Sequence, residues 1–149
     1  AIVVGAPKPV QGTIDLPLAK KPVNGRERMA PSRDTGKAAR TDYRVVDTAR
    51  KLTWLALEPW TGRTHQLRAH CAALGTPILG DGKYGGAAAF VTGMDMGRGL
   101  HLLARSIRLR LPSGSDLEIE ASLPDHMGKT WSLLGFGRSD SATTRANRR

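Results

Sequence analysis

The sequence predicts a mixed α+β fold with a largely antiparallel sheet and flanking helices. Three observations support this prediction. Short segments in which apolar and polar residues alternate are separated by turn residues, which is typical of antiparallel strands. One segment instead repeats its apolar residues with helical spacing. The chain has 149 residues, of which 40% are hydrophobic, so it has the size and composition of a domain with a single core.

The first half of the chain contains three expected strands. Residues 1–5 are rich in β-branched side chains and run into a Gly-Ala-Pro sequence, which is typical of a short strand. Residues 41–47 alternate between apolar and polar side chains, and residues 52–57 form an apolar run that contains Trp54. We expect these two segments to pair as an antiparallel hairpin that turns at residues 48–51.

A helix is predicted at residues 64–74. Leu67, Cys71 and Leu74 fall on one helical stripe, and the glycine and proline that follow the segment are typical helix stops. Residues 80–99 are rich in glycine, and we expect them to be irregular.

The last part of the chain predicts two more strands and a helix. Alternating side chains indicate a strand at residues 100–111 and a returning strand at residues 117–120, and a short helix is expected at residues 124–134. We therefore place one domain at residues 1–134 and a basic, disordered tail at residues 135–149.

Composition also indicates a compartment. No apolar run approaches the roughly 18 residues that a membrane span needs, and the first residues show no signal-peptide pattern. The single cysteine, Cys71, allows neither an internal disulfide nor a cysteine-based zinc finger. We expect a cytoplasmic protein with no membrane partner.

The chain is strongly basic, with 23 lysines and arginines against 13 acidic residues and a net charge of +10. This charge favours a polyanionic partner, with nucleic acid as the first candidate, although an acidic protein, an anionic membrane or solubility alone would also account for it. Glycines and prolines interrupt the most basic segment, residues 19–40, and predict a mobile basic loop. We expect this loop to bind the phosphates of a nucleic acid. Its cations are Lys20, Lys21, Arg26, Arg28, Arg33, Lys37 and Arg40.

The sequence indicates neither a nucleotide cofactor nor a metal ion. Residues 80–85 match a GxGxxG pattern but lack the preceding strand and the spaced acidic residue of a dinucleotide site. Gly-Lys pairs at residues 36–37 and 82–83 lack the Ser or Thr that completes a P-loop. His65 and His70 are five positions apart, which turns them about 140° from each other on a helix. We expect no cofactor and no metal site.

A dense polar run, residues 61–68, lies at the start of the predicted helix. Backbone N–H groups at a helix N-terminus favour anions, and arginines add charge-assisted donors. These residues alone leave two interpretations open, an anion-binding site or a capped and solvated first turn. The candidate side chains are Arg63, Thr64, His65, Gln66 and Arg68.

The same run resembles a long motif of the RluA-type pseudouridine synthase family, which reads GRTHQ(I/L)R, then a histidine, LGxPI and GDxxYG. The residues that carry this resemblance are Gly62 to Arg68, His70, Leu74 to Ile78, Gly80, Asp81, Tyr84 and Gly85. Shorter similarities at residues 1–5, 12–18, 28–43 and 100–101 extend it from Ala1 to about Pro124.

The resemblance implies isomerisation of uridine to pseudouridine in structured ribosomal or transfer RNA, without a metal or a cofactor. In that family, an aspartate in an HRLDxxTSG motif acts on a flipped-out nucleotide. Arg68 matches the basic residue that pairs with this aspartate, and Arg63, Thr64, His65 and Gln66 match the rest of the active-site motif.

The HRLD motif does not occur in these 149 residues. We therefore expect the chain to be the later half of a pseudouridine synthase catalytic domain, to need the upstream half as its partner, and to be inactive alone. The alternative is a non-catalytic RNA-binding module.

Overall fold

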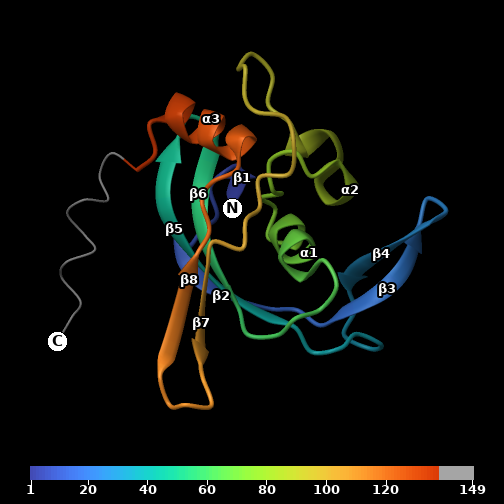
Figure 1. The fold of residues 1–149 in the computed structure, drawn as a ribbon. Helices are drawn as coiled ribbons and strands as arrows, with labels where there is room; N and C mark the ends of the chain where they lie inside the picture. Colours follow the sequence, from blue (N-terminus) through green and yellow to red (C-terminus); the bar gives the residue numbers. More distant parts are fainter. Residues whose placement is uncertain (138–149) are drawn as a thin grey trace.

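The computed structural model describes residues 1–137, which are built around a four-stranded antiparallel sheet (Figure 1). In spatial order the strands are β1 (Ile2–Val4), β6 (Leu52–Pro59), β5 (Arg40–Ala49) and β2 (Gln11–Asp15). Helices pack beside the sheet, so the predicted α+β class is confirmed.

The predicted central hairpin is confirmed. On β5, Tyr43 is buried and the next residue, Arg44, is exposed, as the alternation of the sequence predicts. The register shifts once, between Val45 and Asp47, where a bulge interrupts the pairing with β6. Arg50, in the predicted turn, has a left-handed backbone with φ 59°, which fits a tight connection between two twisted strands.

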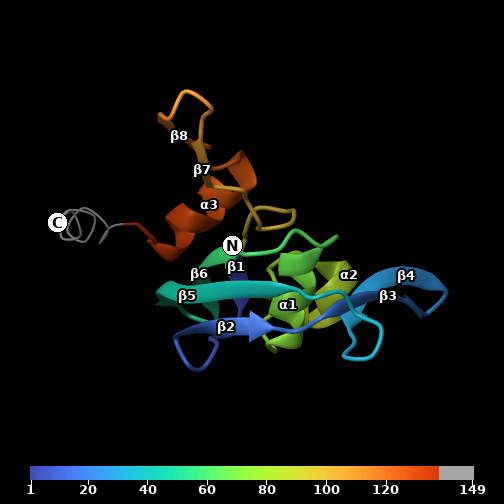
Figure 2. The same cartoon turned by 90° about the horizontal axis from the view of Figure 1, so that it is seen from below.

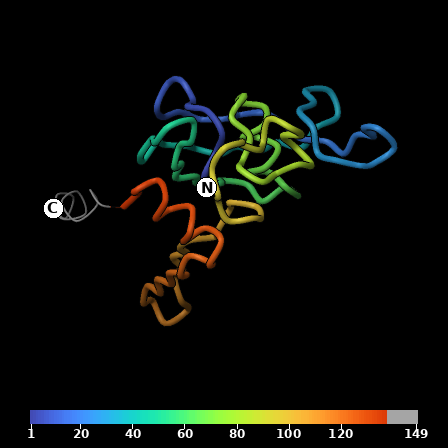
Figure 3. Tube along the Cα trace, turned by 90° about the horizontal axis from the view of Figure 1, so that it is seen from above, coloured from blue at the N-terminus to red at the C-terminus, as the bar shows by residue number. Residues whose placement is uncertain are grey.

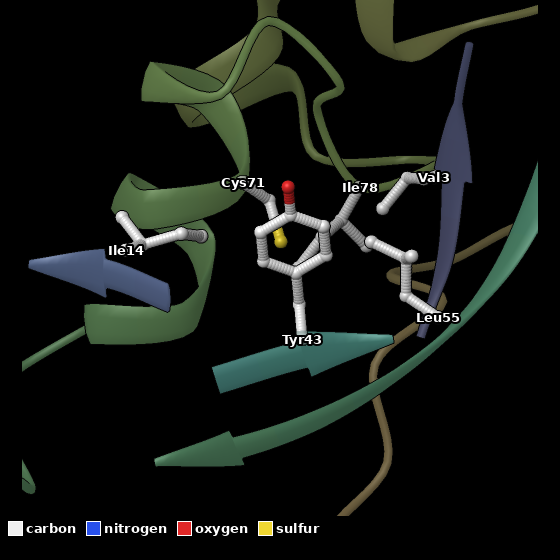
Figure 4. Close-up of a cluster of buried hydrophobic side chains, with 6 residues drawn as sticks. All are labelled: Val3, Ile14, Tyr43, Leu55, Cys71 and Ile78. Carbon is white, nitrogen blue, oxygen red and sulfur yellow. The ribbon is translucent and has the colours of Figure 1, made fainter. Parts of the chain in front are cut away.

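The predicted helix is also confirmed, as α1 (Gln66–Ala73), and it packs against the sheet (Figure 4). Cys71 is fully buried, and this burial raises the pKa of its thiol to about 12, so it packs as a small apolar side chain. The cluster around it joins the helix to all four strands of the sheet. Its members are Val3, Ile14, Tyr43, Leu55, Cys71 and Ile78.

A second apolar cluster fixes the C-terminal helix, α3 (Asp125–Leu134). Trp131 on this helix meets Trp54 on β6 edge to face, with ring centroids 4.7 Å apart. Phe136 belongs to the same cluster and is buried. The predicted tail begins at residue 135, so its second residue still packs against the core. The rest of the predicted tail, residues 138–149, lies outside the described residues.

The basic segment, residues 19–40, is a loop only over residues 32–39, and the loop prediction was wrong for residues 19–31. Residues 18–31 form a second hairpin, with strands β3 (Leu18–Val23) and β4 (Arg26–Pro31), which projects from the domain (Figure 2). Asn24 and Gly25 form its turn with φ values of 50° and 74°. An Asn-Gly pair is the preferred sequence for such a turn, so the signal was present but hidden among lysines and prolines.

The predicted strand at residues 100–111 was too long. Only β7 (Ser106–Arg110) forms, paired with β8 (Asp116–Glu120), while residue 101 is fastened by separate backbone bonds to Ile2 and Leu79. The glycine-rich segment, residues 80–99, is irregular only in part. It contains two short helices, α2 (Gly82–Gly85) and the 3-10 helix η1 (Gly86–Ala89).

The β7–β8 hairpin extends away from the domain in a different direction from β3–β4 (Figure 3). One of its faces carries ion pairs, between Arg108 and Glu118 and between Arg110 and Asp116. The other face is apolar, and its side chains are 38–51% exposed. These apolar residues are Ile107, Leu109, Leu117 and Ile119.

The turn before α2 yields a stability prediction. Gly80 and Gly75 share φ +83°, so an alanine at either position adopts a left-handed backbone that costs about 1–2 kcal/mol. A methyl group at Gly80 would also overlap the carbonyl oxygen of Gly99, whereas nothing lies within 4 Å of the corresponding position at Gly75. In urea denaturation, Gly80→Ala should lower the free energy of unfolding by about 2 kcal/mol more than Gly75→Ala. Equal losses would contradict this close approach.

Candidate functional site

The centre of the candidate site is an ion pair between Arg68 on α1 and Asp81. Arg68 Nε lies 2.9 Å from Asp81 Oδ2, and Arg68 Nη2 lies 2.7 Å from Asp81 Oδ1, so two parallel hydrogen bonds join the groups. The Asp81 side chain is 1% exposed and that of Arg68 is 19% exposed. The hydrogen bond with Asp81 is the main reason that the pKa of Arg68 is raised. Arg68 is therefore a fixed and permanent positive charge.

Asp81 is placed by the turn that leads into α2. Its backbone N–H donates to the carbonyl of Ile78, and its carboxylate accepts a hydrogen bond from the backbone N–H of Tyr84 at 3.2 Å. The same carboxylate therefore caps α2 and binds Arg68. The sequence motif includes Asp81, but residue spacing alone does not reveal its burial or its partner.

Tyr84 connects the ion pair to its surroundings. The Arg68 guanidinium lies 4.9 Å from the centre of the Tyr84 ring, within range of a cation–π interaction. The Tyr84 hydroxyl is 2.9 Å from His65 Nδ1 and accepts a hydrogen bond from the backbone N–H of Met29 on β4. Burial, followed by the charges of Arg68 and Lys83, lowers the pKa of His65. The basic hairpin is thus attached to both helices.

Gln66 is a structural clamp at the start of α1. It is 4% exposed, and its carbonyl oxygen accepts hydrogen bonds from the Thr61 hydroxyl and the Arg63 backbone N–H. Its amide donates to the backbone carbonyl of Arg40 and to the hydroxyl of Thr41. Since both ends of the amide are used within the chain, Gln66 orders the loop before α1 instead of presenting a free group to solvent.

The network continues to His70. Its Nδ1 lies 2.9 Å from the Thr41 hydroxyl and its Nε2 lies 3.0 Å from the Leu16 carbonyl. The ring is fully buried, and this burial lowers the pKa of His70, so the imidazole is neutral. His70 therefore joins α1 to the sheet, while His65 lies exposed at the other side of the helix start.

The predicted cationic residues separate into two grooves beside the β3–β4 hairpin. A groove of about 500 Å³ is lined by Lys20, Lys37, Arg63 and Thr64, and a second of about 710 Å³ is lined by Arg26, Arg28 and Lys83. Arg28 also donates to the Lys83 carbonyl at 3.2 Å, which fastens β4 to α2. Lys21 is exposed on β3, opposite Arg28, and lines neither groove.

Residues 1–137 contain neither a cluster of metal ligands nor a membrane-spanning helix. No group of three or more His, Cys, Asp or Glu side chains in this part of the chain could hold a metal ion. Within the same residues, no helix is long and apolar enough to cross a membrane.

Comparisons with known proteins agree with the motif at this site. The sequence profile of the RNA pseudouridylate synthase family matches residues 1–73. RNA pseudouridine synthase 4, mitochondrial, of Arabidopsis thaliana is 35% identical over 90% of this chain and 39% of its own length. Dual-specificity RNA pseudouridine synthase RluA of Escherichia coli is 48% identical over 56% of this chain and 38% of its own length.

Comparison of the fold with solved structures indicates the same family. The solved structure of Human RNA Pseudouridylate Synthase Domain Containing 4 superimposes with a TM-score of 0.69 and 27% identity, covering 91% of this chain and 60% of that one. The chain belongs to the RluA-type pseudouridine synthase family. It spans about two fifths of the length of the curated relatives named above.

The motif shared with this family lies on two neighbouring elements of the structure. Helix α1 carries Arg68, and the loop before it carries the exposed residues Arg63, Thr64 and His65. Asp81 lies at the start of α2. The buried ion pair joins the two halves of the motif.

The ion pair yields a second stability prediction. Asp81→Asn leaves the partly buried Arg68 charge without its partner and should lower the free energy of unfolding by about 3 kcal/mol. The double variant Arg68→Met/Asp81→Asn removes both charges and should lose less than the sum of the single changes, with a coupling of about 1–3 kcal/mol. Urea denaturation of the four proteins measures this coupling. Additive losses would show that the two groups do not depend on each other.

Proposed function

We propose that this chain supplies the RNA-binding surface and one wall of the active site of an enzyme that isomerises uridine to pseudouridine in structured ribosomal or transfer RNA. The observation that carries the proposal is the fixed guanidinium of Arg68 in the family motif. Asp81 occupies Nε and Nη2, while Nη1 makes no hydrogen bond within residues 1–137. That group remains available to a second carboxylate.

In this proposal, the reacting aspartate comes from an HRLD-type segment outside these 149 residues. A nucleophilic carboxylate in a desolvated site needs a positive partner to stay ionised, and a planar guanidinium also aims it. Isomerisation breaks the bond between N1 of uracil and C1′ of ribose and forms a bond from C5 to the same carbon. C5 loses its proton and N1 gains one, so the overall composition is unchanged. Arg68 orients and stabilises the aspartate and does not itself exchange a proton.

RNA binding in the proposal uses the two cationic grooves. Flipping a uridine out of its stack costs a few kcal/mol, which phosphate contacts elsewhere must offset. The exposed cations Lys20, Lys37 and Arg63 lie on one side of the β3–β4 hairpin, and Arg26 and Arg28 line the groove on the other. An RNA backbone that follows the hairpin would meet both groups.

The preceding half of the catalytic domain is the proposed intramolecular partner. Two apolar surfaces in the described residues support this proposal. One is the exposed apolar face of the β7–β8 hairpin, and the other is a nearby groove of about 700 Å³. Trp54, Leu57, Leu67 and Leu103 are among the residues that line this groove. Since Leu67 precedes Arg68, a segment seated there would pass close to the guanidinium.

The proposal predicts how Arg68 contributes to turnover. In a longer polypeptide that includes the HRLD-type segment, Arg68→Ala should lower the single-turnover rate by about two to four powers of ten, because an unpaired buried carboxylate costs about 3–5 kcal/mol. Arg68→Lys should restore only part of the rate, because an ammonium lacks the planar fork. Tritium release from C5-labelled RNA measures the rate, and filter binding should show a smaller loss of affinity.

Two outcomes would contradict this assignment. One is a wild-type rate in Arg68→Ala, with folding verified by circular dichroism. The other is robust pseudouridine formation by the 149-residue chain alone, which would place the reacting carboxylate within this sequence. RNA binding without turnover in the longer polypeptide would instead favour a non-catalytic RNA-binding module.

The cationic surface predicts a steep salt dependence of RNA binding. If about four side chains contact phosphates, the slope of log affinity against log salt should lie near −3 to −4. Neutralising Lys20, Lys21, Arg26 and Arg28 together should weaken binding and flatten this slope. A matched control neutralises Arg105, Arg108, Arg110 and Lys129, which are all engaged in ion pairs, and it should have a much smaller effect. Equal effects of the two variants would refute the assigned surface.

A further inference from the structure

Trp60 is exposed and yet held in a fixed orientation. It lies directly after β6, and 63% of its surface is accessible. Its indole N–H donates a 2.7 Å hydrogen bond to Oδ2 of Asp42, and the guanidinium of Arg40 lies 5.5 Å from its ring centre. An aromatic ring that is fixed at its edge and accessible over its surface needs no reordering before another flat group stacks on it.

The carboxylate that holds the ring is itself constrained. Asp42 Oδ1 accepts a hydrogen bond from the Thr13 hydroxyl at 2.6 Å and lies 3.7 Å from Arg40 Nη2. Hydrogen bonds from Thr13 and then Trp60 lower the pKa of Asp42, so it remains an ionised acceptor at neutral pH. Its negative charge is compensated by Arg40, which reduces its repulsion of a nearby phosphate.

The position of Trp60 connects it to the cationic groove of Lys20, Lys37 and Arg63. Gly62 and Arg63, two and three residues further along the chain, line that groove. The Trp60 backbone N–H donates to the Arg40 carbonyl, and Arg63 Nε donates to the Ala38 carbonyl, so the two segments lie side by side. A strand of RNA in the groove would therefore pass beside the segment that carries this ring.

We propose that Trp60 is a stacking platform for an unpaired nucleobase of the bound RNA, adjacent to the phosphates held by the groove. This inference rests on the proposed function, because it assumes an RNA substrate. A tryptophan face stacks on any base, and Arg40 at the ring adds a cationic group that favours the nearby phosphate. The platform therefore contributes affinity for unpaired segments without selecting a sequence.

The first experiment uses the 149-residue chain and an RNA stem-loop with an unpaired loop. Stacking should quench tryptophan fluorescence in the wild type. Trp60→Phe should abolish most of the quenching, because Trp54 and Trp131 are partly buried and pack edge to face against each other in the second apolar cluster. Trp60→Leu should weaken binding about tenfold, the size expected for one stacked base, whereas Trp60→Phe should retain most of the affinity.

A second pair of variants separates stacking from charge. Asp42→Ala removes a negative charge, which by electrostatics alone would strengthen RNA binding, but it also releases the indole. The proposal expects weaker binding. Asp47→Ala is the matched control, because Asp47 is on the same strand. Within the described residues, its carboxylate accepts a hydrogen bond only from the Thr48 backbone N–H. Its binding should be unchanged or slightly stronger.

The outcomes distinguish this inference from the proposed function. If the wild type binds RNA with a steep salt dependence, but Trp60→Leu binds equally well and fluorescence does not change, the platform is wrong and the proposed function stands. If the wild type does not bind RNA, both are overturned. Weaker binding by Trp60→Leu and Asp42→Ala, with Asp47→Ala unaffected, supports the platform.

Discussion

The buried carboxylate of Asp81 is the constraint on which the arrangement of the site depends. A carboxylate with 1% exposure is stable only when an opposite charge and hydrogen-bond donors surround it, and Arg68 and the Tyr84 backbone N–H meet this need. Arg68 belongs to α1 and Tyr84 to α2, so the ion pair holds the two helices together. Through the Tyr84 hydroxyl and Met29, it also positions the basic hairpin. One buried charge thus links the family motif to the cationic surface.

A second buried network fixes α1 on the sheet. Gln66 donates to the Thr41 hydroxyl, which lies 2.9 Å from His70 Nδ1, and the other side of the imidazole reaches the Leu16 carbonyl. A neutral His70 can make both of these hydrogen bonds, in agreement with the lowering of its pKa by burial. Gln66 also orders the loop before the helix, because its side chain accepts a hydrogen bond from the Arg63 backbone N–H. The backbone of Arg63 is therefore fixed. A site on rigid elements keeps the geometry that catalysis requires.

Local patterns in the sequence were sufficient for the central hairpin and for α1, because their periodicity is set by burial on one face. They were insufficient for β2, where Gly12 and polar side chains weaken the strand signal, and for β3–β4, where charge concealed the Asn24-Gly25 turn. The family motif located Arg68. It did not reveal that Asp81 is its partner within the chain, because that contact depends on how two helices pack in three dimensions.

Within the described residues, the two ends of the molecule differ in how far their cations are engaged in ion pairs. The cations of the β7–β8 hairpin are paired across the strands, as Arg108 is with Glu118. At the other end, Asp81 is buried against Arg68, and Asp42 is compensated by Arg40. The cations that line the two grooves form no ion pair within the described residues. This group of cations without ion pairs lies beside the matched motif. In the proposed function, a phosphate backbone bound there would place its nucleotides within reach of Arg68. The groove cations are Lys20, Arg26, Arg28, Lys37, Arg63 and Lys83.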